Sequence, residues 1–171
     1  MFGHTDFNPD DAPFSCNNKL LAARCYVSSF SDNPNIVCGG DGARLPEGSF
    51  LSAREENFGA TTVAAVAAGN YGVEAIIDGE PQGIISGVAP RARLAVYKVC
   101  WGTLGCGLGD IYAAIDDAIA DGVDVISFSL FIPGFNEELA EAFLNIEKAG
   151  IPVAAAAGDS GPGTLVMSVH C

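Results

Sequence analysis

Cysteine offers the most chemistry in this sequence of 171 residues. The six cysteines are Cys16, Cys25, Cys38, Cys100, Cys106 and Cys171, an even number that allows about 15 complete pairings. None of them stand in a C-x-x-C spacing, so we predict no metal site and no dithiol redox motif. Cys100 and Cys106 lie six positions apart and could close a small disulfide loop, although two free, buried thiols account for them almost equally well.

Proton transfer near neutral pH is the natural task of histidine, and the sequence has only His4 and His170. Each lies near a terminus, so we interpret both as solvated surface residues rather than as catalytic groups. No G-x-x-x-x-G-K-S/T or G-x-G-x-x-G loop opens any of the helices expected below, which argues against nucleotide binding. We therefore predict no cofactor.

Composition restricts the fold class and the partners. Hydrophobic residues make up 49% and charged residues 17%, with a mean hydropathy of +0.30, which excludes intrinsic disorder. Lys and Arg number 8 against 21 Asp and Glu, and the net charge of −13 argues against nucleic acid and anionic membranes as partners. Apolar stretches such as residues 151–158 are far shorter than the roughly 20 residues of a membrane span. Residues 1–6 lack the features of a secretory signal, so the location stays open.

We expect one domain whose N-terminal and C-terminal parts differ in amino-acid composition. Residues 1–50 are rich in Asn, Asp, Gly, Pro and Ser without a sustained apolar period, so we predict an irregular N-terminal arm. Residues 51–171 should form an α/β core. Its first element is the alanine-rich run Ala60–Gly69, which predicts a buried helix that stops at its glycine.

Strands and helices then alternate. The pattern predicts strands at 94–99, 123–130 and 151–157 and helices at 111–122 and 137–149. Asp110 stands in the N-cap place of the first of these helices. Such alternation predicts a parallel sheet with right-handed crossovers, and the near-continuous apolar strands predict burial on both of its faces.

Four blocks carry a more specific signal. They are residues 16–24 (CNNKLLAAR), 85–101 (ISGVAPRARLAVYKVCW), 113–127 (AAIDDAIADGVDVIS) and 157–162 (AGDSGP). In this order they strongly resemble the subtilisin-like serine proteases (subtilases, peptidase S8), above all the cucumisin-like branch of plants and its bacterial relatives. The resemblance implies a three-layer parallel sheet with flanking helices, here incomplete, a serine endopeptidase ancestry and a family that is usually secreted.

The resemblance also implies a catalytic triad in the order Asp, His, Ser. The family's Asp lies in a D-T-G turn that does not occur here, and Asp6 is too close to Cys16 to replace it. Residues 52–70 align without a gap with the family's histidine block, and Gly59 falls on the general base. A shift by one residue would place Phe58 there, and neither residue can accept a proton.

The oxyanion donor and the nucleophile also depart from the family. Asp159 replaces the Asn of an A-A-G-N-S-G-P block, and an ionised carboxylate would repel a developing oxyanion. We interpret Asp159 as a turn residue before Ser160. The nucleophile's G-T-S-M-A block is expected well past the end of this chain, and Ser168 follows the oxyanion block too closely to substitute for it.

A remnant of the substrate cleft is predicted where a family strand ending in S-L-G pairs with the substrate backbone. The corresponding residues here are Ser127, Ser129, Leu130, Phe131, Ala157 and Gly158. Phe131 replaces the glycine, so its ring either fills the groove or packs under the loop 132–135.

Three functions compete. We predict a non-catalytic fragment or pseudoenzyme of the serine endopeptidase family. The alternative is a peptide-binding or regulatory module that holds extended peptides weakly in the remnant cleft, against which Phe131 counts. A protease completed by a second chain would require replacement of Gly59 inside this chain's own helix start. Self-association through the exposed edge of strand 151–157 is also expected.

Overall fold

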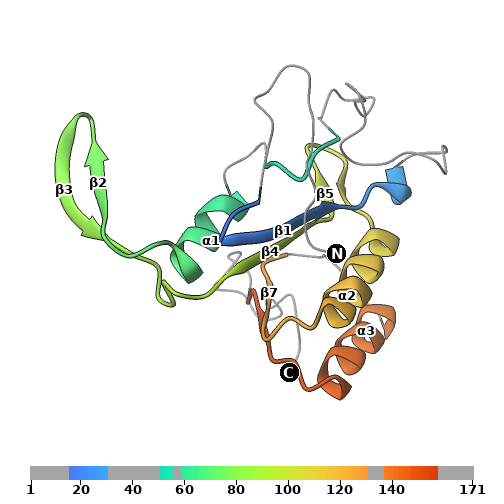
Figure 1. Cartoon of the computed structure of the whole chain (residues 1–171). Helices are drawn as coiled ribbons and strands as arrows, with labels where there is room; N and C mark the ends of the chain where they lie inside the picture. Colours follow the sequence, from blue (N-terminus) through green and yellow to red (C-terminus); the bar gives the residue numbers. More distant parts are fainter. Residues whose placement is uncertain (1–15, 31–50, 56–58, 131–136, 158–171) are drawn as a thin grey trace.

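The structure, a computed structural model, describes residues 16–30, 51–55, 59–130 and 137–157 (Figure 1). The helices in these ranges are α1 (Gly59–Ala68), α2 (Leu108–Asp121), α3 (Glu137–Lys148) and the short 3-10 helix η1 (Ser28–Phe30). The strands are β1 (Leu20–Cys25), β2 (Val73–Ile77), β3 (Glu80–Ile85), β4 (Leu94–Lys98), β5 (Cys100–Trp101), β6 (Gly105–Cys106), β7 (Ile126–Phe128) and β8 (Val153–Ala155).

The described strands pair two by two. β1 runs parallel to β4 with Ala23 opposite Val96, and β7 runs parallel to β8 with Ser127 opposite Ala154. β2 with β3 and β5 with β6 form antiparallel pairs. The fold is therefore α/β with parallel strands, while the single three-layer sheet stays a prediction because the two parallel pairs are not joined by hydrogen bonds among the described residues.

β1 corrects the prediction for the N-terminal arm. Residues 1–50 were expected to be irregular, and this is wrong for Leu20–Cys25. The strand forms because β4, far along the chain, supplies its parallel partner, and a segment of this length shows too little periodicity to reveal that partner in advance. The boundary at residue 50 stays a prediction.

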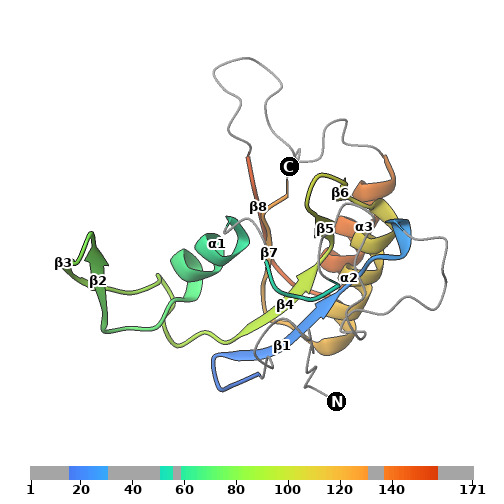
Figure 2. The same ribbon diagram turned by 90° about the horizontal axis from the view of Figure 1, so that it is seen from above.

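The main core lies between α2, α3 and the strands β4 and β7. Ile111 of α2 and Leu139 and Ile146 of α3 are fully buried where the two helices pack side by side (Figure 2). The ring of Phe128 from β7 meets the ring of Phe143 edge to face, with centroids 5.1 Å apart. Burial of each such side chain stabilises the fold by about 1.5–3 kcal/mol, so this cluster holds the C-terminal half together.

The start of α2 differs from the prediction. Gly107 rather than Asp110 is the N-cap residue. Asp110 lies in the first turn, where its buried carboxylate accepts hydrogen bonds from Ser28 Oγ at 2.7 Å and from the backbone N–H of Ser29 at 3.2 Å. A carboxylate is favoured at a helix N-terminus, and here it also ties η1 to α2. The predicted stop at Gly122 is confirmed, since this residue caps α2 with a φ of 72°.

A polar network attaches the β1–β4 pair to α2. The guanidinium of Arg24 bridges Asp117 at 3.0 Å and Asp121 at 3.1 Å. The hydroxyls of Tyr26 and Tyr97 donate to Asp117 and Asp121 respectively, each at 2.8 Å. Burial raises the pKa of both tyrosines above the usual value, and the hydrogen bonds to the two carboxylates raise it further.

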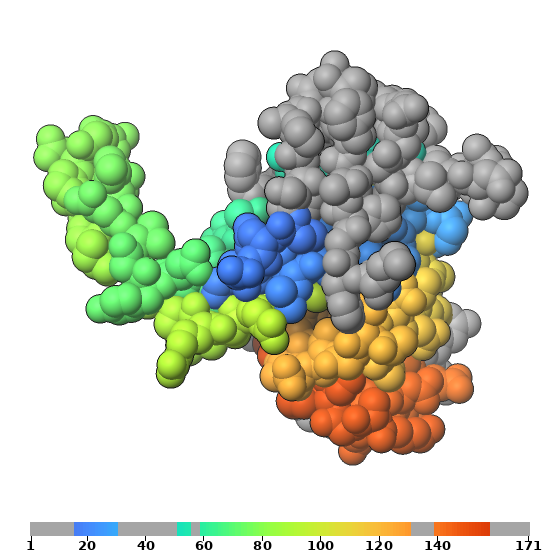
Figure 3. Space-filling view, viewed as in Figure 1, coloured from blue at the N-terminus to red at the C-terminus, as the bar shows by residue number. Residues whose placement is uncertain are grey.

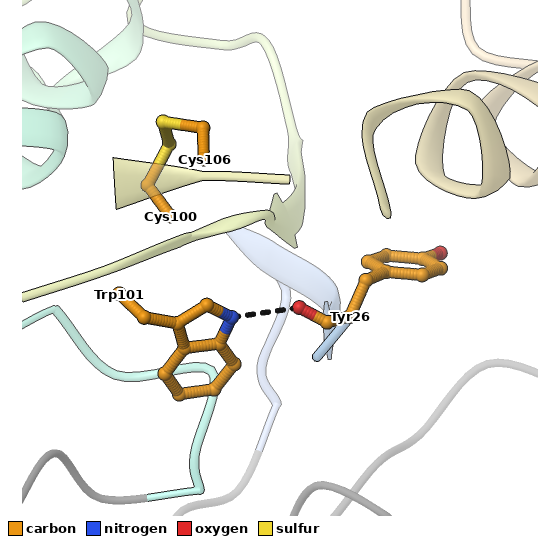
Figure 4. Close-up of a disulfide and its surroundings, with 4 residues drawn as sticks. All are labelled: Tyr26, Cys100, Trp101 and Cys106. Atoms are coloured by element: carbon orange, nitrogen blue, oxygen red, sulfur yellow. Dashed lines mark hydrogen bonds between the residues drawn. A yellow bond between two sulfur atoms is a disulfide. The ribbon is translucent and has the colours of Figure 1, made fainter. Parts of the chain in front are cut away.

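Cys100 and Cys106 face each other across β5 and β6 and form a disulfide (Figure 4). The structure thus selects the closed loop over the pair of free thiols. Trp101, beside Cys100, is completely buried, and its Nε1 donates to the carbonyl of Tyr26 at 2.7 Å. Cys25 is disulfide-bonded as well.

Two burial predictions are wrong. The helix expected at Ala60–Gly69 is confirmed as α1, but Ala68 is its only buried residue and Val66 is 63% exposed. β8 is shorter than predicted, and its Ala154 and Ala155 are exposed rather than covered on both faces. Among the described residues, no further strand extends the β7–β8 pair.

Candidate functional site

The position that the resemblance assigns to the general base is the first residue of α1. Gly59 is exposed there, and among the described residues a Cβ built on it would meet only Oε1 of Glu55, at an ordinary contact distance of 3.5 Å. The backbone therefore leaves room for a larger side chain. Glycine itself offers no atom that could take up a proton.

Glu55 caps the same end of α1. Its carboxylate accepts hydrogen bonds from the backbone N–H groups of Ala60 and of Thr61, the latter at 2.6 Å. Burial alone would raise the pKa of Glu55, but the hydrogen bonds from Thr61 and Ala60 and the charge of Lys98 lower it below the usual range. The carboxylate is thus committed to two of the N–H groups that a helix start leaves without partners.

The other end of α1 is tied to the segment 87–89. The three contacts are Gly87 N to Gly69 O at 3.0 Å, Val88 N to Val66 O at 2.9 Å, and Ala89 N to Ala67 O at 2.9 Å. These N–H groups satisfy carbonyls that the last turn of a helix cannot satisfy itself. The block 85–101 therefore holds the helix of the block 52–70 in place.

Lys19 completes this junction. Its ammonium group donates to the carbonyls of Ala68 at 2.8 Å, Pro90 at 2.8 Å and Ala92 at 2.6 Å. An ammonium group has three N–H donors, so all of them are used. Lys19 belongs to the block 16–24, which means that two of the four blocks, 16–24 and 85–101, meet the aligned segment 52–70 at the end of α1.

β7 positions the described part of the predicted cleft. Ser127 lies within β7, Ser129 and Leu130 follow its carboxyl end, and Ala157 follows that of β8. Ser127 and Ser129 are exposed, with their hydroxyl oxygens 3.3 Å apart. The Ala156 N–H donates to the carbonyl of Phe128 at 3.0 Å and continues the pairing one residue beyond the end of β8. The structure thus brings these four residues to one end of the β7–β8 pair.

Other predicted residues lie outside the described part of the chain. They are His4, Asp6, Phe58, Phe131, Gly158, Asp159, Ser168 and His170, together with Cys38 and Cys171. The described residues include no histidine. The plugging role of Phe131 and the turn role of Asp159 accordingly stay predictions.

Clusters that could bind a metal ion were sought in the described ranges. No group of three or more His, Cys, Asp or Glu side chains comes together there in a suitable arrangement. None of the helices in the same ranges has the length and apolar character that a membrane crossing needs. At the start of α1, the free backbone N–H groups are bound by the carboxylate of Glu55.

Glu55 and Lys19 are the two residues that the sequence analysis did not single out. Glu55 had a local signal, because an acidic residue shortly before a helix start is a common cap. Lys19 had none, since its three acceptor carbonyls belong to distant parts of the chain.

Comparison with known proteins agrees with the four blocks. The sequence model of the peptidase S8 class, described as the subtilase family, matches residues 47–170. Three subtilisin-like proteases of Arabidopsis thaliana are similar over most of this chain. They are SBT3.11 (40% identity, 92% of this chain, 21% of the relative), SBT1.5 (38%, 90%, 19%) and SBT2.2 (36%, 97%, 19%).

The chain belongs to the subtilase family, and its resemblance to the plant branch of that family is confirmed. It spans about a fifth of the length of these curated relatives.

Proposed function

We propose that this chain is a non-catalytic member of the subtilase family, a pseudoenzyme or remnant without peptidase activity of its own. The observation that carries the proposal is Gly59 at the first residue of α1, the position that the aligned family block gives to the general base. The base removes the proton of the nucleophilic serine and returns it to the leaving amine, and a glycine can do neither. Glu55 does not substitute for it, because its carboxylate is engaged by two backbone N–H groups.

The test is incubation of the purified chain with an unfolded protein substrate and with a fluorophosphonate probe for activated serines. Neither hydrolysis nor labelling is expected, because no base activates a serine. Gly59→His is the matched variant, because a Cβ at position 59 meets the described residues only at an ordinary contact distance. It too should stay unlabelled, since triad members act as a unit. Labelling of any serine in the parent chain would overturn the proposal.

We also propose that the pairs β1–β4 and β7–β8 belong to one parallel sheet in a three-layer arrangement. Both pairs are parallel, α2 and α3 lie on one side of them, and α1 lies on the other (Figures 1 and 2). Amide hydrogen exchange tests this. In one sheet, consecutive amides of β4 are protected because both of its edges are paired, whereas in a separate pair every second amide exchanges rapidly.

A second candidate function, the holding of extended peptides without cleavage, is supported by Ser127 and Ser129. Both are exposed, and Ser129 and Leu130 continue beyond the paired part of β7. An added peptide would gain hydrogen bonds worth about 0.5–1.5 kcal/mol each, set against its ordering entropy, so binding should be weak.

Fluorescence anisotropy with extended apolar peptides tests this second function on the parent chain and on Phe131→Gly. If Phe131 plugs the groove, the Phe131→Gly variant should bind the peptides more tightly than the parent chain does. If the parent chain binds at least as tightly, Phe131 does not plug the groove and the peptide-binding function gains support.

A further inference from the structure

The hairpin formed by β2 and β3 projects from the body of the molecule (Figures 1 and 3). Its register places Val73 opposite Ile85 and Ile77 opposite Glu80, and no third strand joins it among the described residues. A two-stranded hairpin is at best marginally stable in water unless a further strand or a helix supports it. The hairpin therefore needs a partner.

Both faces of the hairpin are apolar and open to solvent. The exposed fractions are 62% for Ile76 and 60% for Ile77 in β2, and 63% for Ile84 and 55% for Ile85 in β3. Successive strand residues point to opposite faces, so each pair of neighbours exposes one isoleucine on each side. Contiguous exposed apolar side chains mark an interaction site.

Charge decides which partner fits. Between Asn70 and Pro90 the charged residues are Glu74, Asp78 and Glu80, with no Lys or Arg. In a chain with a net charge of −13, pairing with a second copy would bring like charges together. An apolar segment that carries Lys or Arg would meet opposite charges instead.

The two edges of the hairpin are not equivalent. Pro81 lies within β3 and has no backbone N–H, and a strand proline has its nitrogen on the unpaired edge. The free edge of β3 therefore lacks a donor, while β2 contains no proline and keeps its full set of N–H and C=O groups. β2 is the edge to which another strand can add.

We propose that the free edge of β2 binds an extended segment of a partner protein that is apolar and carries Lys or Arg, as a third strand. Main-chain hydrogen bonds hold the segment, its apolar side chains extend the faces of Ile76 and Ile77, and its cations lie near Glu74 and Asp78. This site is separate from β7 and from the start of α1, so it stands whether or not the chain is catalytic.

The probes are two fluorescein-labelled peptides in which isoleucine alternates with lysine or with glutamate, measured by anisotropy against the whole chain. The lysine peptide should bind at least about fivefold more tightly than the glutamate peptide. A lysine peptide N-methylated at every residue should not bind, because it lacks the donors of a strand. Equal binding of the lysine and glutamate peptides, or binding of the methylated one, would overturn the proposal.

A charge exchange locates the site. The variant Glu74→Lys with Asp78→Lys should reverse the preference of the two peptides. The control is Glu141→Lys with Glu147→Lys on α3, where both residues are exposed, so the net charge changes equally and the preference should persist. The proposal fails if the control reverses the preference too. It also fails if light scattering finds a dimer that the first variant abolishes, since a second copy then occupies the edge.

Discussion

Replacement of Gly87 by alanine should detach the segment 87–89 from α1. A Cβ at Gly87 would lie 2.2 Å from the nitrogen of Gly69, 2.8 Å from the carbonyl oxygen of Ala65 and 2.8 Å from the carbonyl carbon of Ala68. All three are backbone atoms and cannot rotate away as a side chain would. The segment must therefore move off the helix.

The expected loss follows from the contacts that this movement breaks. Three backbone hydrogen bonds of 2.9–3.0 Å join the segment 87–89 to the last turn of α1. Each contributes about 0.5–1.5 kcal/mol net, so their loss should lower the free energy of unfolding by about 2–4 kcal/mol. That is a large share of the roughly 5–15 kcal/mol that a typical domain has.

Urea unfolding followed by circular dichroism, together with amide exchange at Val88 and Ala89, measures this loss. The two amides should exchange at least about 30-fold faster in Gly87→Ala, which corresponds to the lower end of that range. Gly59→Ala is the matched control, because its new Cβ meets Glu55 at 3.5 Å and no other residue of the described ranges, and alanine favours a helix. The reasoning is refuted if Gly87→Ala has the same urea midpoint as the control and keeps its amide protection.

Three further predictions concern the disulfide, the two partly buried tyrosines and the exposed strand edge. Replacement of both Cys100 and Cys106 by serine should lower the free energy of unfolding by about 2–3 kcal/mol in urea titrations, as for any short closed loop. Ultraviolet titration should find Tyr26 and Tyr97 ionising above the usual tyrosine pKa of 10.0. The tyrosines of the unfolded chain release their protons at a lower pH than those of the folded chain. The two tyrosine hydroxyls therefore stabilise the fold fully below about pH 10, and this stabilisation is lost as the pH rises further. A melting temperature that increases above about pH 10 would contradict this expectation. Light scattering should find self-association through the exposed edge of β8, and a monomer at about tens of micromolar would exclude it.

Local patterns predicted the helices well. The stop of α2 at Gly122 and the span of α3, expected at 137–149 and observed at Glu137–Lys148, follow from periodicity and helix-ending residues, which act over a few positions. The N-cap of α2 was wrong for a tertiary reason. Asp110 turns toward Ser28 and Ser29 of η1 instead of capping its own helix, and nothing within the helix sequence indicates that partner.

The β2–β3 hairpin was missed although its signal is local. Asp78-Gly79 between two apolar runs is typical of a two-residue hairpin turn in which both residues have a positive φ, and the structure gives 52° for Asp78 and 84° for Gly79. β1 is the opposite case, since its pairing with β4 could not be read from either segment alone. The candidate site likewise contains one feature with a local sequence signal and one without. The place of Gly59 at a helix start was predictable, and the three carbonyls around Lys19 were not.

The start of α1 indicates that the packing of this fold does not depend on the side chain at position 59. Gly59 is exposed at the first residue of the helix, and Glu55, not residue 59, binds the free N–H groups there. No described contact of the fold depends on a side chain at position 59, so its replacement costs little stability. Gly87 and Lys19 lie at the other end of the same helix, where the loss of a contact would release it. Substitutions at position 59 are therefore compatible with this fold, whereas substitutions at the junction are not.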